Sequence, residues 1–430
     1  MKSFIRILAG SLVVGFFLGG CATYTDESAQ MRTAFRARHY PEALEQLKKT
    51  GLATQDRSRL LYLMETAMIL DRQGNRKEAR KVLLQADKLV DVLYTTSISK
   101  TAATLIVNES MSDYSGEDYE VVSLHTMLAL SFLEDKQYEE ARVEAKKINN
   151  RLHVIAKDRG SNNAYTEDAF ARYLSGLVFE ALGETDDAFI DYRRALELFE
   201  TPGYKEFYYG APPRALVESV ASLAVSKGRP EVLKGLEKRY PQWVTAAKNT
   251  APSGEMGEVA VIHETGFIAV KTTKEFAIPL AGQIIRFSVP YIEKRSAYPS
   301  SMTGVEFQGH FTQADNVADM TSLAHYSLED KRMRLIAKNG ARLLAKAIAT
   351  KQAYDHLGIL GGVAANVYSV VTETADTRGW TLLPEAFSVT RLRLPVGKQT
   401  IQIKNDGRIN QILTVDVKRG QLQILRDCVR

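Results

Sequence analysis

The sequence predicts two parts in one chain: an all-α solenoid of helical repeats, followed by an α+β domain with a β-rich C-terminal end. Apolar residues recur at spacings of three and four from about Glu27 to Tyr240, which is the pattern of amphipathic helices. After residue 257 the apolar period becomes two in segments rich in Val, Ile and Phe, which is the pattern of strands. With 45% hydrophobic and 25% charged residues, the 430-residue chain has the composition of a folded globular protein rather than a disordered one.

The first 20 residues have the form of a secretory signal peptide. Lys2 and Arg6 precede an uncharged apolar run over residues 7–18, and Gly19-Gly20-Cys21 follows. An uncleaved transmembrane anchor is the alternative interpretation, but the strongly apolar part is shorter than the roughly 20 residues that a span requires. No nucleic-acid partner is expected, because 56 basic residues against 51 acidic ones give a net charge of only +5.

The small residues directly before Cys21 resemble the lipobox of bacterial lipoproteins, with Gly19 where Ala or Ser is commoner. The resemblance implies cleavage after Gly20, a fatty acid such as palmitate on Cys21, and membrane lipid as the first partner of the mature chain. Residues 21–26 would then form a lipidated tether. Ala22 rather than Asp follows the cysteine, so the implied location is the outer membrane of a Gram-negative bacterium, facing the periplasm.

Residues 27–243 are predicted to be a divergent array of helical hairpins. Breaks of one form recur between the amphipathic stretches: a polar or glycine turn, one or two acidic residues and an alanine. The best copy spans Ala169 to Pro202, and it carries small, aromatic and aliphatic residues at Gly176, Phe179, Gly183, Ala188, Tyr192, Ala195 and Leu196. Their spacing resembles the tetratricopeptide repeat, a helix-turn-helix unit of about 34 residues.

Such hairpins stack into a curved solenoid, whose groove usually binds a peptide or a helix of a partner protein. A solenoid that only supports the C-terminal domain is the alternative. Residues 203–210 contain four aromatic side chains, and Tyr204, Phe207, Tyr208 and Tyr209 are the candidate partner-binding residues. Packing of these aromatic side chains in the core is the competing interpretation.

Residues 244–257 are predicted to be a linker, because proline, serine and glycine gather there. In the domain 258–430, helices are expected over about 317–372, and strands at 258–263, 267–279, 284–291, 305–311, 387–394, 399–405, 412–418 and 422–427. This order indicates an α+β domain. Once Cys21 carries lipid, Cys428 is the only thiol, which excludes an internal disulfide. A thiol tolerated in a strand is the favoured interpretation, and an intermolecular bridge is the alternative.

One polar cluster of this domain stands out at Asp376, Arg378 and Trp380. A paired site that faces a cleft is one interpretation. The favoured one is a turn between helix and strand that hydrogen bonds lock, because buried charges need partners whatever their role. Residues 374–384, together with 114–120, resemble an uncharacterised family of bacterial lipoproteins that joins repeat helices to a C-terminal α+β domain. That resemblance implies no reaction.

These features predict a lipid-anchored periplasmic scaffold or adaptor that binds a protein of the cell envelope through the groove of its repeats. By analogy with other repeat-bearing lipoproteins, the partner belongs to a cell-wall synthesis or assembly complex. The sequence contains no complete catalytic motif, no cofactor-binding motif and no histidine spacing typical of a metal site. The alternative function is a cell-wall or lipid-modifying enzyme that uses Asp376 with His263, His310 or His325.

Overall fold

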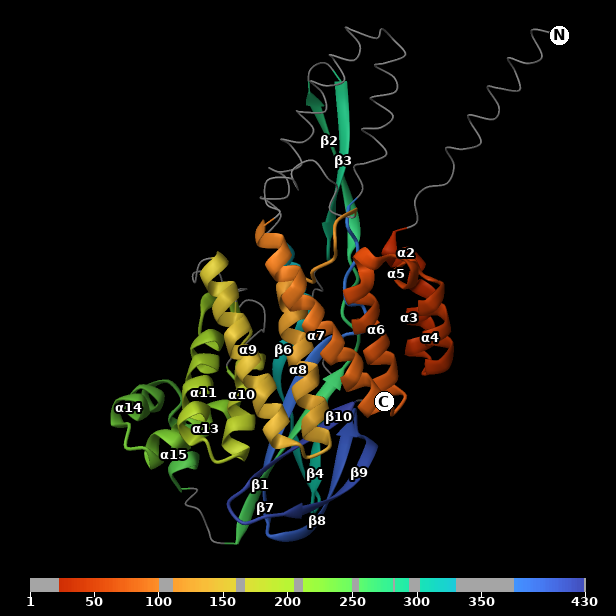
Figure 1. Ribbon diagram of the computed structural model, residues 1–430. Helices are drawn as coiled ribbons and strands as arrows, with labels where there is room; N and C mark the ends of the chain where they lie inside the picture. Colours follow the sequence, from red (N-terminus) through yellow and green to blue (C-terminus); the bar gives the residue numbers. More distant parts are fainter. Residues whose placement is uncertain are drawn as a thin grey trace, which may run out of the picture.

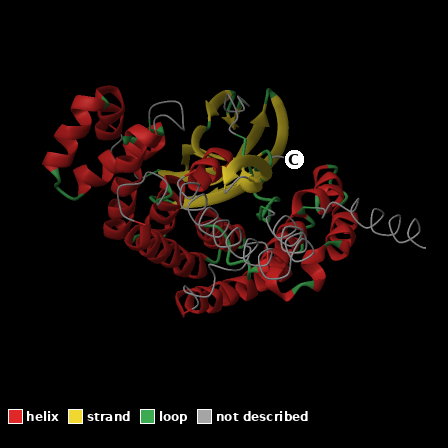
Figure 2. Ribbon diagram, turned by 90° about the horizontal axis from the view of Figure 1, so that it is seen from above, coloured by secondary structure: helices red, strands yellow, loops and turns green. Residues whose placement is uncertain are grey.

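The helices form an arc, and a β-sheet lies on its inner side. The computed structural model describes residues 23–99, 111–159, 167–204, 212–249, 255–280, 283–293, 302–329 and 375–428. The predicted signal peptide and Cys21 lie outside these ranges. Within them the chain has a helical part followed by a sheet-containing part, as the sequence predicts (Figure 1). Seen from above, the helices curve around the strands (Figure 2).

The helical part consists of antiparallel hairpins. From α6 onward, contacts with the sheet are made by the first helix of a hairpin, as α8, α10 and α13 illustrate. The helices are α2 (Tyr24–Glu27), α3 (Ala29–Arg36), α4 (Tyr40–Lys49), α5 (Gly51–Thr54), α6 (Arg59–Arg72), α7 (Arg76–Ser99), α8 (Asp118–Glu134), α9 (Tyr138–Arg159), α10 (Ala169–Ala181), α11 (Thr185–Phe199), α13 (Arg214–Ser226), α14 (Pro230–Arg239) and α15 (Pro241–Asn249), with a 3₁₀ turn at Asp56–Ser58.

The hairpin α10–α11 follows the repeat that the sequence predicts. Asp168 caps α10 by accepting a hydrogen bond from the backbone N–H of Ala171 at 2.9 Å. Gly183 turns the chain between the two helices with a φ of +78°, which a side chain would strain. A Cβ atom at Gly176 would lie 2.4 Å from Cδ1 of Tyr192 on α11. The glycine at this position therefore allows the two helices to approach closely.

The described strands form two four-stranded sheets and a separate two-stranded ribbon. The first sheet has the order β10-β1-β7-β6, the second has the order β5-β4-β8-β9, and β2 pairs with β3. β1 runs parallel to β10 and antiparallel to β7, so the last strand of the chain lies beside the first. The strands are β1 (Met256–Thr265), β2 (Thr272–Leu280), β3 (Gln283–Tyr291), β4 (Thr303–Phe307), β5 (His310–Gln313), β6 (Asp315–Asp319), β7 (Ala386–Pro395), β8 (Gly397–Asn405), β9 (Arg408–Val417) and β10 (Leu422–Cys428).

The first sheet is buried on both faces. Ala260 and Ile262 of β1 belong to the hydrophobic cluster that the helices share, whereas Val259 and Val261 pack against the second sheet. The body therefore has three layers: helices, first sheet and second sheet. Because one cluster joins the helices to the first sheet, the two parts that the sequence separates complete each other's core.

The predicted tether and linker are shorter than the sequence suggests. Thr23 caps α2, and Tyr24 is only 7% exposed. The last part of the 21–26 tether is thus folded onto the body. In the predicted 244–257 linker, Val244 is buried within α15 and β1 already begins at Met256. The composition of these two segments did not reveal their docking, because one well-placed apolar side chain is enough to hold a short segment against the body.

Some strand boundaries also differ from the prediction. The expected strand 305–311 is a hairpin, because Gln308 and Gly309 adopt positive φ and separate β4 from β5. Residues 267–271 precede β2 as an irregular segment, and the expected helical region from 317 begins within β6. A helical run does follow over 320–329, and the remainder of the predicted helices lies outside the described residues.

We expect Gly176→Ala to destabilise the protein by about 1–3 kcal/mol, because the new methyl group overlaps the fully buried ring of Tyr192. Gly235→Ala in α14 is the matched control, since nothing lies within 4 Å of its Cβ position. The control should stabilise by up to about 1 kcal/mol through helix propensity. Urea unfolding of the two variants measures the difference, and equal stabilities would contradict this account of the hairpin.

Candidate functional site

The polar cluster that the sequence analysis singled out, Asp376, Arg378 and Trp380, joins the segment before β7 to the helices through hydrogen bonds. Arg378 and Asp376 meet in a two-pronged ion pair, with Nε 2.9 Å from Oδ1 and Nη2 2.7 Å from Oδ2. Arg378 also donates to Ser58 Oγ at 3.2 Å and to the carbonyl oxygen of Ser112 at 3.0 Å. Because Arg378 is only 7% exposed, this pair has the geometry of a structural lock rather than of a binding site.

Trp380 forms part of the same lock. Its side chain is 1% exposed, and its backbone N–H donates to Glu120 Oε1 at 2.8 Å. Glu120 lies on α8, is fully buried and also accepts from the backbone N–H of Glu117 at 2.9 Å. Lys271, just before β2, donates to Glu117 at 2.7 Å. Segments before β2 and before β7 thus converge on the start of α8.

Glu65 is a site residue that the sequence analysis missed. It lies on α6, is completely buried, and accepts hydrogen bonds from Tyr24, from the backbone and hydroxyl of Thr381, and from the backbone of Leu382, at 2.7–3.2 Å. Burial raises the pKa of Glu65 from 4.5 to about 7, although the donated hydrogen bonds oppose this shift. The sequence did carry a signal for Glu65: it is a glutamate within an otherwise apolar stretch of a predicted helix. A carboxylate in such a place needs hydrogen-bond donors from elsewhere in the chain.

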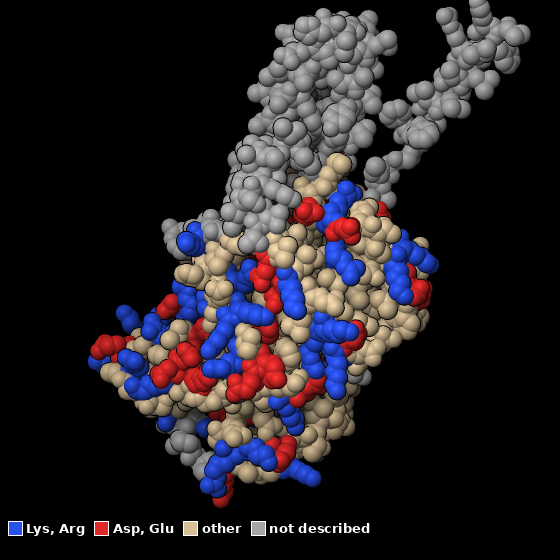
Figure 3. Space-filling model, viewed as in Figure 1, with Lys and Arg blue, Asp and Glu red and all other residues tan. Residues whose placement is uncertain are grey.

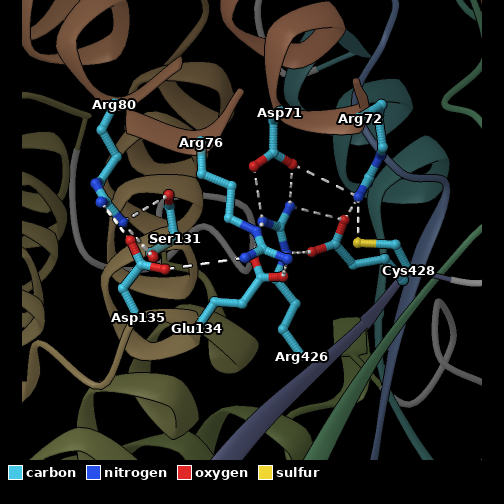
Figure 4. Close-up of polar contacts among 10 residues, drawn as sticks. Asp71, Arg72, Arg76, Arg80, Ser131, Glu134, Asp135, Arg426 and Cys428 are labelled. Carbon is cyan, nitrogen blue, oxygen red and sulfur yellow. Dashed lines mark hydrogen bonds and ion pairs between the residues drawn. The ribbon is translucent and has the colours of Figure 1, made fainter. Parts of the chain in front are cut away.

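A second polar cluster joins the helices to the last strand (Figure 4). Arg426 of β10 lies 2.8 Å from Asp71 of α6, 3.3 Å from Glu134 of α8 and 2.5 Å from Glu264 of β1. Glu264 also pairs with Arg72. Burial alone would raise the pKa of Asp71, but the positive charges of Arg426 and Arg72 outweigh it and lower the pKa. The same two arginines also lower the pKa of Glu264, so Asp71 and Glu264 are ionised partners of the guanidinium groups.

A cavity of about 230 Å³ lies beside this second cluster. Arg36, Arg38 and Phe267 line it together with the cluster. Burial raises the pKa of Cys428, which also lines the cavity, to about 11. The protonated thiol is a poor nucleophile and exchanges slowly with disulfides, so this environment does not favour an intermolecular bridge.

The histidines proposed for an enzyme do not assemble with Asp376. In the described chain, His263 lies 2.9 Å from Thr390 Oγ1 and 2.9 Å from Asp427 Oδ2. Thr390, His263 and Asp427 are thus arranged like the nucleophile, base and acid of a catalytic triad. All three residues are at most 1% exposed, so a substrate cannot reach the hydroxyl of Thr390. His325 Nδ1 lies 2.6 Å from the carbonyl oxygen of Ile292. His310 lies on the edge strand β5.

The predicted partner-binding aromatics are corrected in part. Tyr204 is 1% exposed, accepts from the backbone N–H of Ala169 at 3.1 Å and donates to the carbonyl oxygen of Glu167. It is a core residue and the prediction for it is wrong, because a buried tyrosine needs a partner for its hydroxyl and finds one here. Phe207, Tyr208 and Tyr209 lie outside the described residues.

The predicted groove is occupied by the chain itself. The inner helices α8 and α10 contact β10, and Phe170 of α10 stacks on Phe387 of β7 with ring centroids 4.5 Å apart. Arg391 of β7 reaches Glu180 of α10 at 2.7 Å and Ser219 of α13 at 2.7 Å. Over the described residues, the inner face of the arc is thus an internal interface and does not present a groove for a partner.

The outer face carries a wide hollow on α7. Figure 3 shows positive and negative side chains interspersed over the helices on this side. The hollow, about 820 Å³, lies where α7 meets the end of α8, and it is lined by Lys77, Arg80, Lys81, Leu84, Gln85, Lys88, Phe132, Asp135 and Gln137. Lysine side chains and the apolar side chains of Leu84 and Phe132 line it together, and Leu84 is 36% exposed.

No grouping of His, Cys, Asp and Glu suited to a metal ion occurs among the residues that the structure describes. Within the same ranges, none of the helices combines the length with the apolar character that crossing a bilayer requires.

Comparisons with known proteins found no matching family model and no matching curated protein. Solved helical-repeat structures do resemble the chain. The crystal structure of MamA has 14% identity and a TM-score of 0.30, covering 51% of this chain and 94% of MamA. A putative kinesin light chain of Podosopora anserina with nearly identical TPR-like repeats has 16% identity and a TM-score of 0.32, covering 52% and 93%. A Rap protein complexed with competence and sporulation factor has 15% identity and a TM-score of 0.30, covering 58% and 61%.

The pKa of Glu65 predicts that its contribution to stability falls as pH rises. Below about pH 4.5 the carboxyl group is protonated in both the folded and the unfolded chain, and its contribution is fully present. Between pH 4.5 and 7 only the unfolded chain releases the proton readily, so stability is lost as pH rises through about 7. Relative to Glu65→Gln, the wild type should lose on the order of 3 kcal/mol between pH 4.5 and 8. Urea unfolding across this range measures the loss, and parallel curves would contradict it.

Proposed function

We propose that this protein is a lipid-anchored scaffold of the cell envelope, which binds an acidic segment of a protein partner on the outer face of its helical arc. The hollow on α7 is the observation that supports a binding role. Lysine ammonium groups that share the hollow with Leu84 and Phe132 suit a peptide that carries both carboxylates and an apolar anchor. The inner face is already covered by the sheet, so an outer surface is the one left for a partner.

The start of the described chain supports close attachment to a membrane. Thr23 caps α2, and Tyr24 of α2 donates its hydroxyl to Glu65 at 2.8 Å in the core. Cys21 precedes Thr23 by two residues, which span at most about 7 Å. If Cys21 carries lipid, the body is therefore held directly at the membrane surface and not on a long tether. The outer membrane, facing the periplasm, remains the proposed location, and a cell-wall synthesis or assembly complex remains the proposed setting of the partner.

Lipid attachment is tested by metabolic labelling with radioactive palmitate. We expect the wild-type protein to incorporate label and Cys21→Ser to incorporate none, because the sulfur of Cys21 is the proposed acceptor. Cys428→Ser is the matched control and should label like the wild type, since burial keeps the Cys428 thiol protonated. Labelling of Cys21→Ser, or absence of label from the wild type, would contradict the anchor.

Partner binding is tested by placing a photocrosslinking amino acid at Leu84 in living cells. Leu84 lines the hollow, whereas Ile190 of α11 is 63% exposed outside it and serves as the control position. We expect a discrete crosslinked product from Leu84 and none of that size from Ile190. Combining Lys77→Glu, Lys81→Glu and Lys88→Glu should reduce the product about tenfold, because the attraction for carboxylates is reversed. A product that is unaffected by these changes, or that forms equally from Ile190, would refute the proposed surface.

A further inference from the structure

The cavity beside the second polar cluster lies between two helical turns and the ends of two strands. Residues of the α3–α4 and α6–α7 turns line it together with the ends of β1 and β10. Its volume of about 230 Å³ is many times the roughly 10–15 Å³ that one water molecule needs. It shares no lining residue with the hollow on α7. The cavity is therefore a separate space, large enough for a small ligand.

Guanidinium groups outnumber carboxylates around this cavity. Among the described residues that line it, five are arginines and three carry carboxylates. The carboxylates are already paired with arginines of the cluster (Figure 4), and the residues in these pairs are Asp71, Glu134 and Glu264 with Arg72, Arg76 and Arg426. Arg36 and Arg38 are exposed at the cavity, and within the described ranges neither has a carboxylate partner. Two positive charges are thus left for a ligand.

Arg38 occupies a backbone position that favours glycine. Five described helical hairpins have turns with the same hydrogen-bond pattern, and one residue of each turn has a positive φ. That residue is a glycine in three hairpins, Lys136 in the α8–α9 turn, and Arg38, with a φ of +63°, in the α3–α4 turn. A long side chain is kept at Arg38 against the local preference of the backbone. Such backbone strain is found most often at functional sites.

Arg36 lies against an aromatic wall of the cavity. Its guanidinium carbon is 5.3 Å from the centre of the Phe267 ring. Phe267 packs edge to face on Phe35 with ring centroids 5.7 Å apart, and Phe35 packs on Tyr40 in the same way at 5.5 Å. All three rings line the cavity. The cavity therefore combines guanidinium groups with an apolar surface, which suits an anion that carries an organic part.

We propose that this cavity binds a small phosphate ester, with the phosphate group on Arg36 and Arg38 and the organic part against Phe35 and Phe267. The planar guanidinium fork matches the oxygen atoms of a phosphate group. A phosphate monoester carries about 1.5 to 2 negative charges at pH 7, so it balances two arginines better than a single carboxylate does. The proposed lipid anchor and the proposed partner surface are not needed for this site.

The same phosphate chemistry occurs in soluble esters and in the headgroup of phosphatidic acid. In either case the ligand would contact helices and strands together, because the lining residues come from α3, α7, β1 and β10. A ligand that binds only the folded chain stabilises it by mass action. Binding should therefore raise the melting temperature of the protein as well as release or absorb heat.

The test is isothermal titration calorimetry of the full chain, purified in detergent, with phenyl phosphate as the probe. Arg38→Gly removes one guanidinium group and places at this turn the residue that its backbone favours, so the variant should melt no lower than the parent. Lys136→Gly makes the same change in the α8–α9 turn, outside the lining of the cavity. We expect the parent to bind one phenyl phosphate, Arg38→Gly to bind it at least about tenfold more weakly, and Lys136→Gly to bind it like the parent, because a hydrogen bond between charged groups is lost only in the first variant.

Two further probes define the chemistry of the ligand. Benzoate has the same ring but a single negative charge, and it should bind more weakly than phenyl phosphate. Dihexanoyl phosphatidic acid carries the phosphate group on a lipid. Tighter binding of this probe than of phenyl phosphate would assign the site to a lipid headgroup, and the reverse order would assign it to a soluble ester.

Three results would overturn the inference. Neither phosphate probe binds the parent, or Lys136→Gly weakens binding as much as Arg38→Gly does, or benzoate binds as tightly as phenyl phosphate. Because Arg38→Gly relieves the backbone at its own position, weaker binding by this variant could not be attributed to loss of the fold. The melting temperatures of the parent and both variants check this directly.

Discussion

Buried carboxylates on the inner helices are the constraint on which the rest of the structure depends. Buried Glu65 and Glu120 accept backbone hydrogen bonds from residues 380–382, and the partly buried Glu180 accepts from Arg391 of β7. A carboxylate is costly to bury without hydrogen-bond donors. Removing one partner of a buried ion pair, for comparison, lowers the free energy of unfolding by about 3–5 kcal/mol. These helices therefore need the C-terminal part of the chain, and the sheet in turn needs the helices to cover its apolar face.

This mutual requirement explains why the arc encloses its own sheet. In a helical solenoid the inner surface is the usual place for a partner's peptide. Here residues that come last in the chain fill that place, and the parallel pairing of β1 with β10 fixes the end of the chain beside the first strand. The hollow on α7, in contrast, lies on the outer helices and is not covered by the sheet.

Several features gather at one end of the molecule. The turn α2, the segment before β2 and the start of α8 are linked by Thr25, Lys271 and Glu117. The same region holds Arg378, which bridges Ser58 and Ser112. The first described residues are thus joined by hydrogen bonds to the segment before β2, and through it to the start of α8.

The periodicity of the sequence by itself determined the classes of the elements and much of their order. Helical hairpins, the small residue at Gly176, and strands close to β1, β3, β7, β8, β9 and β10 all follow from local spacing, because secondary structure reflects which positions must be apolar. The sequence placed Asp376 and Arg378 two residues apart but left open whether they meet, and the structure shows that they do.

Only the tertiary structure decided which surface remained free. Glu65 and Thr381 are 316 residues apart, and Asp71 and Arg426 are 355 apart, so no local pattern announces their contact. The burial of Tyr204, the docking of Tyr24 and the filling of the groove have the same origin. Each depends on the shape of a surface that forms only when distant segments pack together, and spacing along the chain carries no record of that shape.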